Sequence, residues 1–293
     1  MSKLQESLQA GKFTITGEIG PPKGVDLHHC MDEEVSFIRD RVVAINVTDN
    51  QSSVMRVCSL SICALLARKG LEPILQITCR DRNRLGIQGD VLGAYVQGIR
   101  NILSLTGDHN TAGDHPGSKP VFDLDSVSLL QAMTSLKNGK DLAGNDLEGV
   151  PNDLFCGAIV TPEADPVEMQ LIKMERKIEA GAQFFQTQAI YDPKVFEDFM
   201  NKASKFKVPV LCGIVIIKSA GMASYMNNFV PGVRVPEEMI KVLKEAPKED
   251  RAKRSIELMA DFIEKVKPMC QGLHIMAMGW EKYVPEMLDM CDL

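Results

Sequence analysis

Acidic and amide side chains stand at the ends of several apolar segments, where an enzyme could place groups for acid catalysis and ligand binding. Glu18 lies near the end of the apolar segment 13–19, and Asp108 follows the apolar segment 102–105. A carboxylate among apolar neighbours is partly desolvated, and desolvation raises its pKa toward the range of a useful general acid. No histidine stands at these ends as a base. The other polar residues there are Thr48, Asp49, Asn50, Gln76, Thr78, Thr106, Thr161, Glu163, Gln188, Lys218 and Ser219.

Two other interpretations of the carboxylates are open at this point. Either Glu18 or Asp108 could be a solvated loop acid or a helix cap, and a single residue does not distinguish these roles from catalysis. Glycosidases also use paired carboxylates. Sugar binding usually relies on stacking rings, however, and Trp280 is the only tryptophan. The glycosidase interpretation is therefore weak.

The segments that must position these residues alternate between short apolar runs and longer amphipathic stretches. This alternation is typical of β/α units around a parallel sheet. Eight such units in a row predict a single eight-stranded β/α (TIM) barrel over residues 1–293, in which strand C-termini supply the active site. The expected strands are 13–19, 42–47, 73–78, 102–105, 155–160, 183–187, 208–214 and 272–277. Helices are expected over, for example, 53–68, 166–180, 193–206 and 252–267, with Gly70 and Gly181 at helix C-termini.

Loops and missing motifs narrow the function further. The irregular stretches 107–123 and 138–152 are the best candidates for functional or covering loops. The turn after the first expected strand lacks GxGxxG, and the stretch 113–120 lacks the spacing of a phosphate loop. A dinucleotide-binding open sheet and a nucleotide triphosphatase are therefore not expected.

Composition indicates a globular protein of the cytoplasm. The 293 residues are 45% hydrophobic, carry a net charge of -6 and contain no dense basic block, which disfavours disorder and nucleic-acid binding. The longest apolar run, 211–217, is far shorter than the roughly 20 residues of a membrane span. Eight scattered cysteines without a CxxC pair predict reduced, mostly buried thiols. The cluster 28–30 is interpreted as a polar loop, and no metal is expected.

Seven short motifs occur in one order along nearly the whole chain. Together they resemble the methylenetetrahydrofolate reductase family, in the bacterial form that is a bare catalytic barrel and most like acetogen-type members. The motifs are Thr16-Gly-Glu-Ile-Gly-Pro-Pro, Val47-Thr48, Gln76-Ile-Thr-Cys, Thr106-Gly-Asp, Thr161-Pro-Glu, Arg176-Lys-Ile-Glu-Ala-Gly-Ala and Gln186-Thr-Gln.

This resemblance implies a flavoenzyme that passes hydride from reduced flavin to 5,10-methylenetetrahydrofolate and gives 5-methyltetrahydrofolate. FAD is expected ahead of FMN. Glu18 would contact the substrate and act as the general acid, Asp108 would tune the flavin, and Gln188 would contact the pterin. Lys177 would counter a phosphate. The residues that the resemblance places around the flavin are Thr48, Gln76, Gly107, Asp108, Phe122, Asp125, Thr161 and Lys177.

Three positions depart from the family pattern. Gln76 stands where many members have His, Phe122 where they have Tyr, and Ala220 where well-known bacterial members have a Phe against substrate or nicotinamide. Direct NADH binding is therefore less secure than flavin and folate binding. The resemblance also implies a separate iron-sulfur or zinc electron-transfer subunit. A homo-oligomer is open as well, because the methionines at 276, 278, 287 and 290 could form part of an interface.

Two other functions remain open from the sequence. One is a flavin-free pterin-binding barrel that passes a methyl group to a corrinoid protein. The other is a subunit for electron transfer or scaffolding whose pocket does not turn over. Fold alone does not separate them. Flavin absorption excludes the first, and reoxidation of the reduced flavin by methylenetetrahydrofolate excludes the second.

Overall fold

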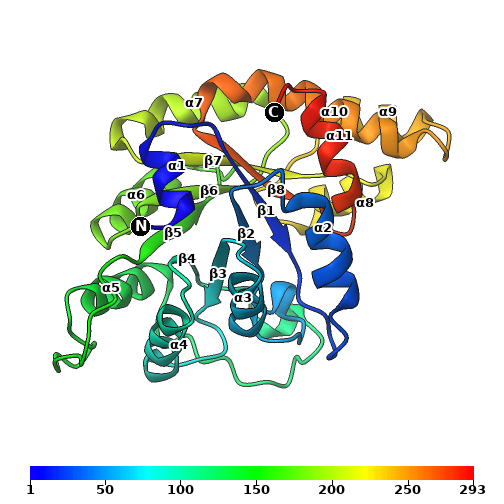
Figure 1. Cartoon of the computed structure of the whole chain (residues 1–293). Coiled ribbons are helices and arrows are strands. Elements are labelled where there is room, and N and C mark those ends of the chain that lie inside the picture. The colour runs from blue at the N-terminus through cyan, green and yellow to red at the C-terminus, as the bar shows by residue number, and fades with distance from the viewer.

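Eight parallel strands close into a barrel in the computed structural model, which describes residues 1–293 (Figure 1). Each strand pairs with the next along the chain, and β8 pairs with β1. The predicted TIM barrel is confirmed, and each expected strand is present. The strands are β1 (Thr14–Ile19), β2 (Ala44–Val47), β3 (Pro73–Thr78), β4 (Asn101–Leu105), β5 (Phe155–Val160), β6 (Phe184–Ala189), β7 (Val210–Val215) and β8 (Gly272–Met276).

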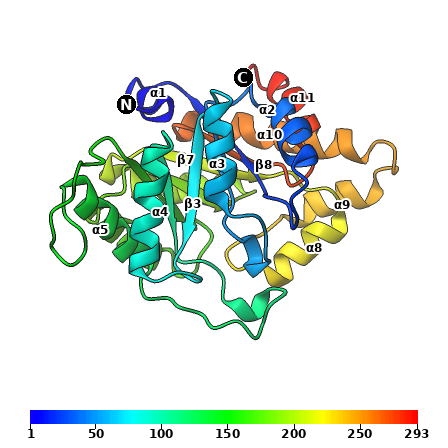
Figure 2. The ribbon, with the colours of Figure 1, turned by 60° about the horizontal axis from the view of Figure 1, so that its bottom comes forward.

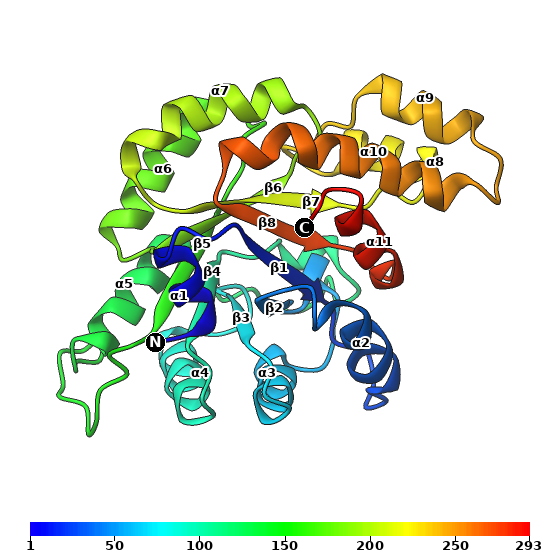
Figure 3. The same ribbon diagram turned by 45° about the horizontal axis from the view of Figure 1, so that its top comes forward.

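Helices surround the barrel and cover the outer face of its sheet (Figures 1 and 3). The main hydrophobic core, a cluster of 65 buried residues, lies mostly between these helices and the sheet. No helix is both long enough and apolar enough to span a membrane. The helices are α1 (Lys3–Gln9), α2 (Val35–Ile38), α3 (Ser59–Arg68), α4 (Arg84–Val96), α5 (Ser126–Lys137), α6 (Val167–Glu179), α7 (Pro193–Ala203), α8 (Ala220–Phe229), α9 (Glu237–Glu245), α10 (Arg251–Val266) and α11 (Val284–Asp289).

The inside of the barrel is filled by a second, smaller cluster at the N-terminal ends of the strands. Leu4 and Leu8 of α1 pack into this end, and Figure 3 shows α1 lying across it. The rings of Phe155 and Phe184 stack there at a centroid distance of 5.0 Å. Gly157 makes room for them, because a Cβ at that position would lie 2.3 Å from the Phe184 ring. This end of the barrel is therefore apolar and closed.

One helix prediction is wrong at its start. Residues 53–68 were expected to be helical, but α3 begins at Ser59. The preceding residues Asn50, Ser52 and Ser53 have positive φ values of 46°, 54° and 57°, which an α-helix does not allow. The expected helices over 166–180, 193–206 and 252–267 are present within about a residue, although the last turn of the second is a 3-10 turn (Ser204–Phe206).

The two glycines expected at helix ends are confirmed. Gly70 and Gly181 lie just beyond α3 and α6 with φ values of +76° and +115°. At Gly181 a Cβ would also lie 2.2 Å from Thr134 Oγ1, so both the backbone angle and the space require glycine. The thiol prediction is confirmed too, because all eight cysteines are free and only Cys58 is exposed.

The two candidate loops lie at opposite ends of the barrel. The stretch 107–123 follows β4 and packs on the loops after β1 and β2. From the first of these loops Lys23 Nζ lies 2.6 Å from Asp114 Oδ2, and from the second the Met55 N–H donates to Asp114 at 3.1 Å (Figure 2). The stretch 138–152 follows α5 and folds back on itself through a bridge between Lys140 and Asp146. Since α5 runs against the strand direction, only the first loop covers the C-terminal ends of the strands.

Candidate functional site

A cavity of about 340 Å³ opens at the C-terminal ends of the strands. Strand side chains alternate between the two faces of a sheet, so inward-facing residues repeat every second position along each strand. A register shift in β6 between Gln186 and Ala189 breaks this rule and brings both Thr187 and Gln188 to the cavity. Six of the residues predicted to act in catalysis or to bind flavin or folate line it together: Glu18, Thr48, Gln76, Gly107, Asp108 and Gln188. The strand-end residues Asp49, Asn50, Thr78 and Thr106 line it too.

Glu18 is nearly buried at the end of β1, with about 10% of its side chain exposed. Its Oε2 atom accepts a hydrogen bond from Gln76 Nε2 at 2.8 Å. The same oxygen lies 3.4 Å from His274 Nε2. The carboxylate is therefore held from two sides, by β3 and by β8.

His274 is a functional candidate that the sequence interpretation missed. Its Nδ1 lies 3.3 Å from Asn46 Nδ2 and 3.1 Å from Thr16 Oγ1. The Asn46 amide nitrogen is fixed by a hydrogen bond to the Gly17 carbonyl oxygen at 3.1 Å, so an N–H faces Nδ1. Nδ1 then accepts, and the neutral ring carries its proton on Nε2, toward Glu18. His274 lies within its strand, not at its end, but alternation with Gly272 and Met276 could have placed it inside.

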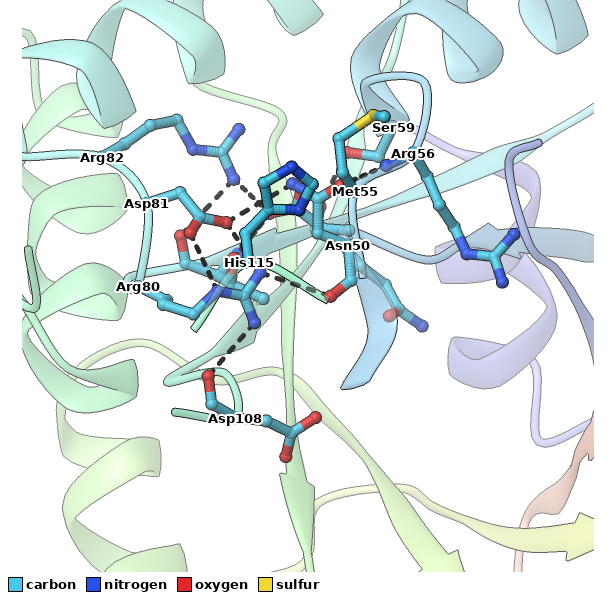
Figure 4. Close-up of polar contacts among 12 residues, drawn as sticks. Asn50, Met55, Arg56, Ser59, Arg80, Asp81, Arg82, Asp108 and His115 are labelled. Atoms are coloured by element: carbon cyan, nitrogen blue, oxygen red, sulfur yellow. Dashed lines mark hydrogen bonds and ion pairs between the residues drawn. The ribbon is translucent and has the colours of Figure 1, made fainter. Parts of the chain in front are cut away.

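The turn after β4 brings Gly107 and Asp108 to the rim of the cavity. Gly107 has a φ of +90°, and a Cβ there would lie 3.0 Å from the Thr78 Cβ. The Asp108 carbonyl oxygen accepts from Arg80 Nη1 at 3.2 Å, while its carboxylate is exposed and points away from that guanidinium (Figure 4). The turn thus holds Asp108 through its backbone and leaves the carboxylate free for a ligand.

Arg80 joins the loops after β2, β3 and β4 and is only 1% exposed (Figure 4). Its guanidinium donates to both carboxylate oxygens of Asp81, at 2.8 and 2.7 Å, and to the Asn50 carbonyl at 3.3 Å. Burial opposes ionisation of Asp81, but the hydrogen bonds and charge of Arg80 outweigh burial and lower the pKa of Asp81.

A buried acid, Asp49, stands beside this network. Asp49 Oδ2 accepts from the Thr78 N–H and hydroxyl, each at 2.8 Å, and forms an ion pair with Arg82. The pair of arginines was also missed. Three charged residues in the run 80–82, one residue beyond a fully buried strand, are the signal that could have revealed it.

A second cleft of about 740 Å³ adjoins the cavity at Thr106. It contains the predicted residues Phe122 and Asp125. Asp125 is the N-cap of α5, where it accepts from the backbone N–H groups of residues 127 and 128 at 3.0 and 2.8 Å. Arg176, which the sequence interpretation did not select, supplies a cation to the same cleft.

Lys177 and Thr161 line neither space. The Lys177 ammonium donates to the Ile159 carbonyl oxygen at 2.7 Å, and burial, with a small contribution from Lys173, lowers the pKa of this lysine to about 8. Thr161 packs against Gly232, where a Cβ would lie 2.3 Å from the Thr161 methyl group. The predicted roles of Lys177 and Thr161 in flavin binding therefore stay predictions from the family resemblance.

The chain has a closed barrel, with an acid and a polar cavity at the C-terminal ends of its strands. These features place it among the β/α-barrel enzymes. The family model described as methylenetetrahydrofolate reductase matches residues 3–292, so the chain belongs to that family. The family predicted from the ordered motifs is confirmed. The resemblance to acetogen-type members stays a prediction.

Relatives of this family share about a quarter of their residues with the chain. The 5,10-methylenetetrahydrofolate reductase of Pectobacterium carotovorum is 26% identical over 78% of this chain and 72% of its own length. Methylenetetrahydrofolate reductase 2 of Schizosaccharomyces pombe is 29% identical over 68% of this chain and 32% of its own length. A solved Clostridium thermocellum protein, described as binding two copies of 5-methyl-5,6,7,8-tetrahydrofolic acid, is 16% identical with a TM-score of 0.67, covering 99% of this chain and 98% of that one. This last likeness shows the shared fold.

Proposed function

We propose that this chain reduces 5,10-methylenetetrahydrofolate to 5-methyltetrahydrofolate with a bound flavin as the hydride donor. The observation that carries the proposal is the nearly buried carboxylate of Glu18, held by Gln76 and His274 at the base of a polar cavity. Family membership and a barrel neighbour described as binding methyltetrahydrofolate support folate as the substrate.

The residues around the cavity fit a flavin. Thr48 Oγ1 is buried and has no hydrogen-bond partner, so it is free to bond the polar edge of a ring system. Gly107 has no side chain of its own, so a ligand can approach its backbone closely. In the adjoining cleft, the Arg176 cation can bind a phosphate, and the extra volume supports FAD ahead of FMN. A bound flavin would supply the hydride.

Glu18 would contribute the proton that opens the five-membered ring of the substrate. Protonation of a ring nitrogen breaks its bond to the methylene carbon and leaves a cationic iminium that accepts hydride. Gln188 would orient the pterin, since its side-chain oxygen accepts from the Ala189 N–H at 3.1 Å and its N–H groups stay available. Asp108, with its carboxylate exposed at the rim, would set the local charge near the ring system.

We also propose that electrons reach the flavin through a separate iron-sulfur or zinc subunit. Ala220 begins α8 beside the N-cap Ser219 and offers no ring for a nicotinamide. The cysteines are dispersed and mostly buried, so the chain has no group of its own to hold a cluster. Poor NADH oxidation by the isolated chain, beside good activity with an artificial dye, is the expected result. Comparable rates with NADH and dye would overturn this part.

The spectrum of the purified protein tests the main proposal. Flavin absorption that bleaches with dithionite under anaerobic conditions and returns with methylenetetrahydrofolate is expected. A colourless protein that transfers a methyl group from methyltetrahydrofolate to a corrinoid protein would establish the alternative, a pterin-binding methyltransferase. A yellow protein that dithionite bleaches but methylenetetrahydrofolate does not reoxidise would leave only an electron-transfer or scaffold role.

A further inference from the structure

Gln76 lies against the proposed acid and not simply at the wall of the cavity. It is 5% exposed, and its Nε2 atom donates to Glu18 Oε2 at 2.8 Å. We infer that Gln76 is a positioning residue for Glu18, rather than the flavin contact that its place in the family pattern implies. This inference rests on the proposed function, because it concerns the same acid.

Both donors to the carboxylate meet the same oxygen. Gln76 Nε2 and His274 Nε2 lie 2.8 and 3.4 Å from Glu18 Oε2, and Oε1 takes no hydrogen bond from the protein. Since a carboxyl group protonates on the oxygen that is not already accepting donors, Oε1 is the atom that carries the catalytic proton. Gln76 thereby decides which oxygen faces the substrate.

The strand order explains why a glutamine is needed for this contact. β3 is two strands from β1, with β2 between them. The amide of Gln76 must therefore reach across the inside of the barrel to Glu18, while His274 approaches from β8, the neighbour of β1 on the other side. Loss of the contact from β3 leaves the carboxylate free to turn about its own bonds. A general acid that turns spends less time in its reactive orientation.

Replacement of Gln76 should also change the pH dependence of the acid step. Hydrogen bonds to a carboxylate favour its charged form, so removal of one donor favours the protonated acid. The charged or titratable groups around the same cavity are His274 from β8, Asp49 from the loop after β2, Arg80 after β3 and Asp108 after β4. None of these changes when Gln76 is replaced. The folate half-reaction of a variant without the donor should therefore persist to higher pH, by about one pH unit.

The test compares two groups of Gln76 variants in the full-length flavoprotein. Gln76→Met removes the donor at similar length, and Gln76→Asn shortens the amide so that it no longer reaches Glu18. Gln76→His keeps an N–H donor. Stopped-flow oxidation of the reduced enzyme by methylenetetrahydrofolate is followed from pH 5 to 9, together with flavin affinity and midpoint potential.

We expect Met and Asn to lower the limiting rate by about tenfold and to move the pH midpoint upward. His, which keeps an N–H donor but itself titrates in this pH range, should retain most of the limiting rate. Flavin affinity and potential should not change. The matched control is Gln183→Met, which removes an amide that accepts from Cys156 N–H and Lys137 away from the cavity, and should leave the pH midpoint unmoved.

A changed flavin affinity or potential with an unmoved pH midpoint in Met and Asn would overturn the inference and restore Gln76 as a flavin contact. A midpoint that moves equally in Gln183→Met would assign the effect to general loosening of the fold. If either Gln76 variant fails to fold, the other gives the result. Failure of the proposed function is distinguishable, because the wild-type protein itself would then lack flavin absorption or reoxidation by the folate.

Discussion

The two ends of the barrel interior are built from the same strands but differ in chemistry. On β6, Phe184 fills the N-terminal end, Gln186 lies two residues farther on, and Gln188 lines the cavity. On β2 the same progression runs from Ala44 through Asn46 to Thr48. The first end is apolar and closed by α1, whereas the other end is polar and open. On these two strands, four residues therefore separate the packed core from the ligand site.

Between the two ends lies a middle layer formed by Asn46 and Gln186, and it has an energetic cost. Asn46 and Gln186 are fully buried, yet Asn46 Oδ1 and Gln186 Oε1 have no hydrogen-bond partner. Unpaired buried polar atoms destabilise a fold, so they persist where function retains them or where a ligand or water completes them. Packing at the apolar end must offset the destabilisation that these unpaired atoms cause. Stability and chemistry are thus separated along the barrel axis, and substitutions at the two ends should have separable effects.

Replacement of Phe184 by alanine should have the largest effect on stability. The ring is fully buried and stacks on Phe155, so its loss removes transfer energy and leaves a cavity that costs about 3–5 kcal/mol of unfolding free energy. Urea unfolding measures this change, and flavin affinity of the folded fraction should stay near the wild-type value. Phe37→Ala, at a ring that is 43% exposed, is the control with a smaller loss. A stability loss no greater than that of the control would break the comparison.

Glu18→Gln, at the polar end, should lower activity and leave stability nearly unchanged. The amide keeps the size of the side chain but cannot supply the proton, so the folate half-reaction should slow by roughly a hundredfold or more. Flavin reduction by an artificial donor and the urea midpoint should change little. Stopped-flow measurements of the two half-reactions separate these terms. Equal slowing of both would place Glu18 in flavin binding or structure instead.

Asp108→Asn should change the charge at the rim of the cavity without affecting the proton that Glu18 supplies. A carboxylate near the ring disfavours the anionic reduced flavin through Coulomb repulsion, so its neutralisation should raise the midpoint potential. The expected rise is roughly 30 mV, equivalent to about 1.4 kcal/mol for a two-electron couple. Dye equilibration measures the potential in the flavin-bound variant. An unchanged value would show that Asp108 lies too far from the ring to tune it.

The fold could be predicted from the sequence because its signals are local and repeated. Each strand is a short apolar run between amphipathic stretches, and each of the eight runs became a strand. The start of α3 was misjudged because left-handed residues such as Ser52 carry no signal in an apolar periodicity. The cavity was only partly predicted. Strand-end residues such as Glu18 and Thr48 were found, since a barrel brings strand ends together.

The parts of the site that were missed depend on distant partners. His274 is recognisable only when β8 closes onto β1, and Arg80 only when three loops meet around its guanidinium. Arg176, and not Lys177, lines the second cleft, although both belong to one motif. Adjacent residues on a helix point about 100° apart. The motif therefore identified the right helix turn without deciding which cation faces the cleft.

The smallest expected effect concerns Lys177, a partly buried charge whose proposed role toward a phosphate can be read from stability. Burial lowers its pKa to about 8 in the folded protein, against about 10.5 for an ordinary lysine. Between these two pH values the unfolded chain holds a proton that the folded flavin-free protein lacks. The free energy of unfolding should therefore rise with pH across this window.

A flavin phosphate near Lys177 would favour the ammonium form and flatten this rise, so urea titrations at pH 7.5 to 10.5 should give a shallower slope with flavin bound than without it. Lys177→Met should remove the rise in the flavin-free protein, whereas Lys173→Met, at an exposed neighbour on α6, should retain it. A rise that survives in Lys177→Met would assign the titration to another group. An equal slope with and without flavin would leave Lys177 as a buried donor to Ile159 that takes no part in binding the phosphate.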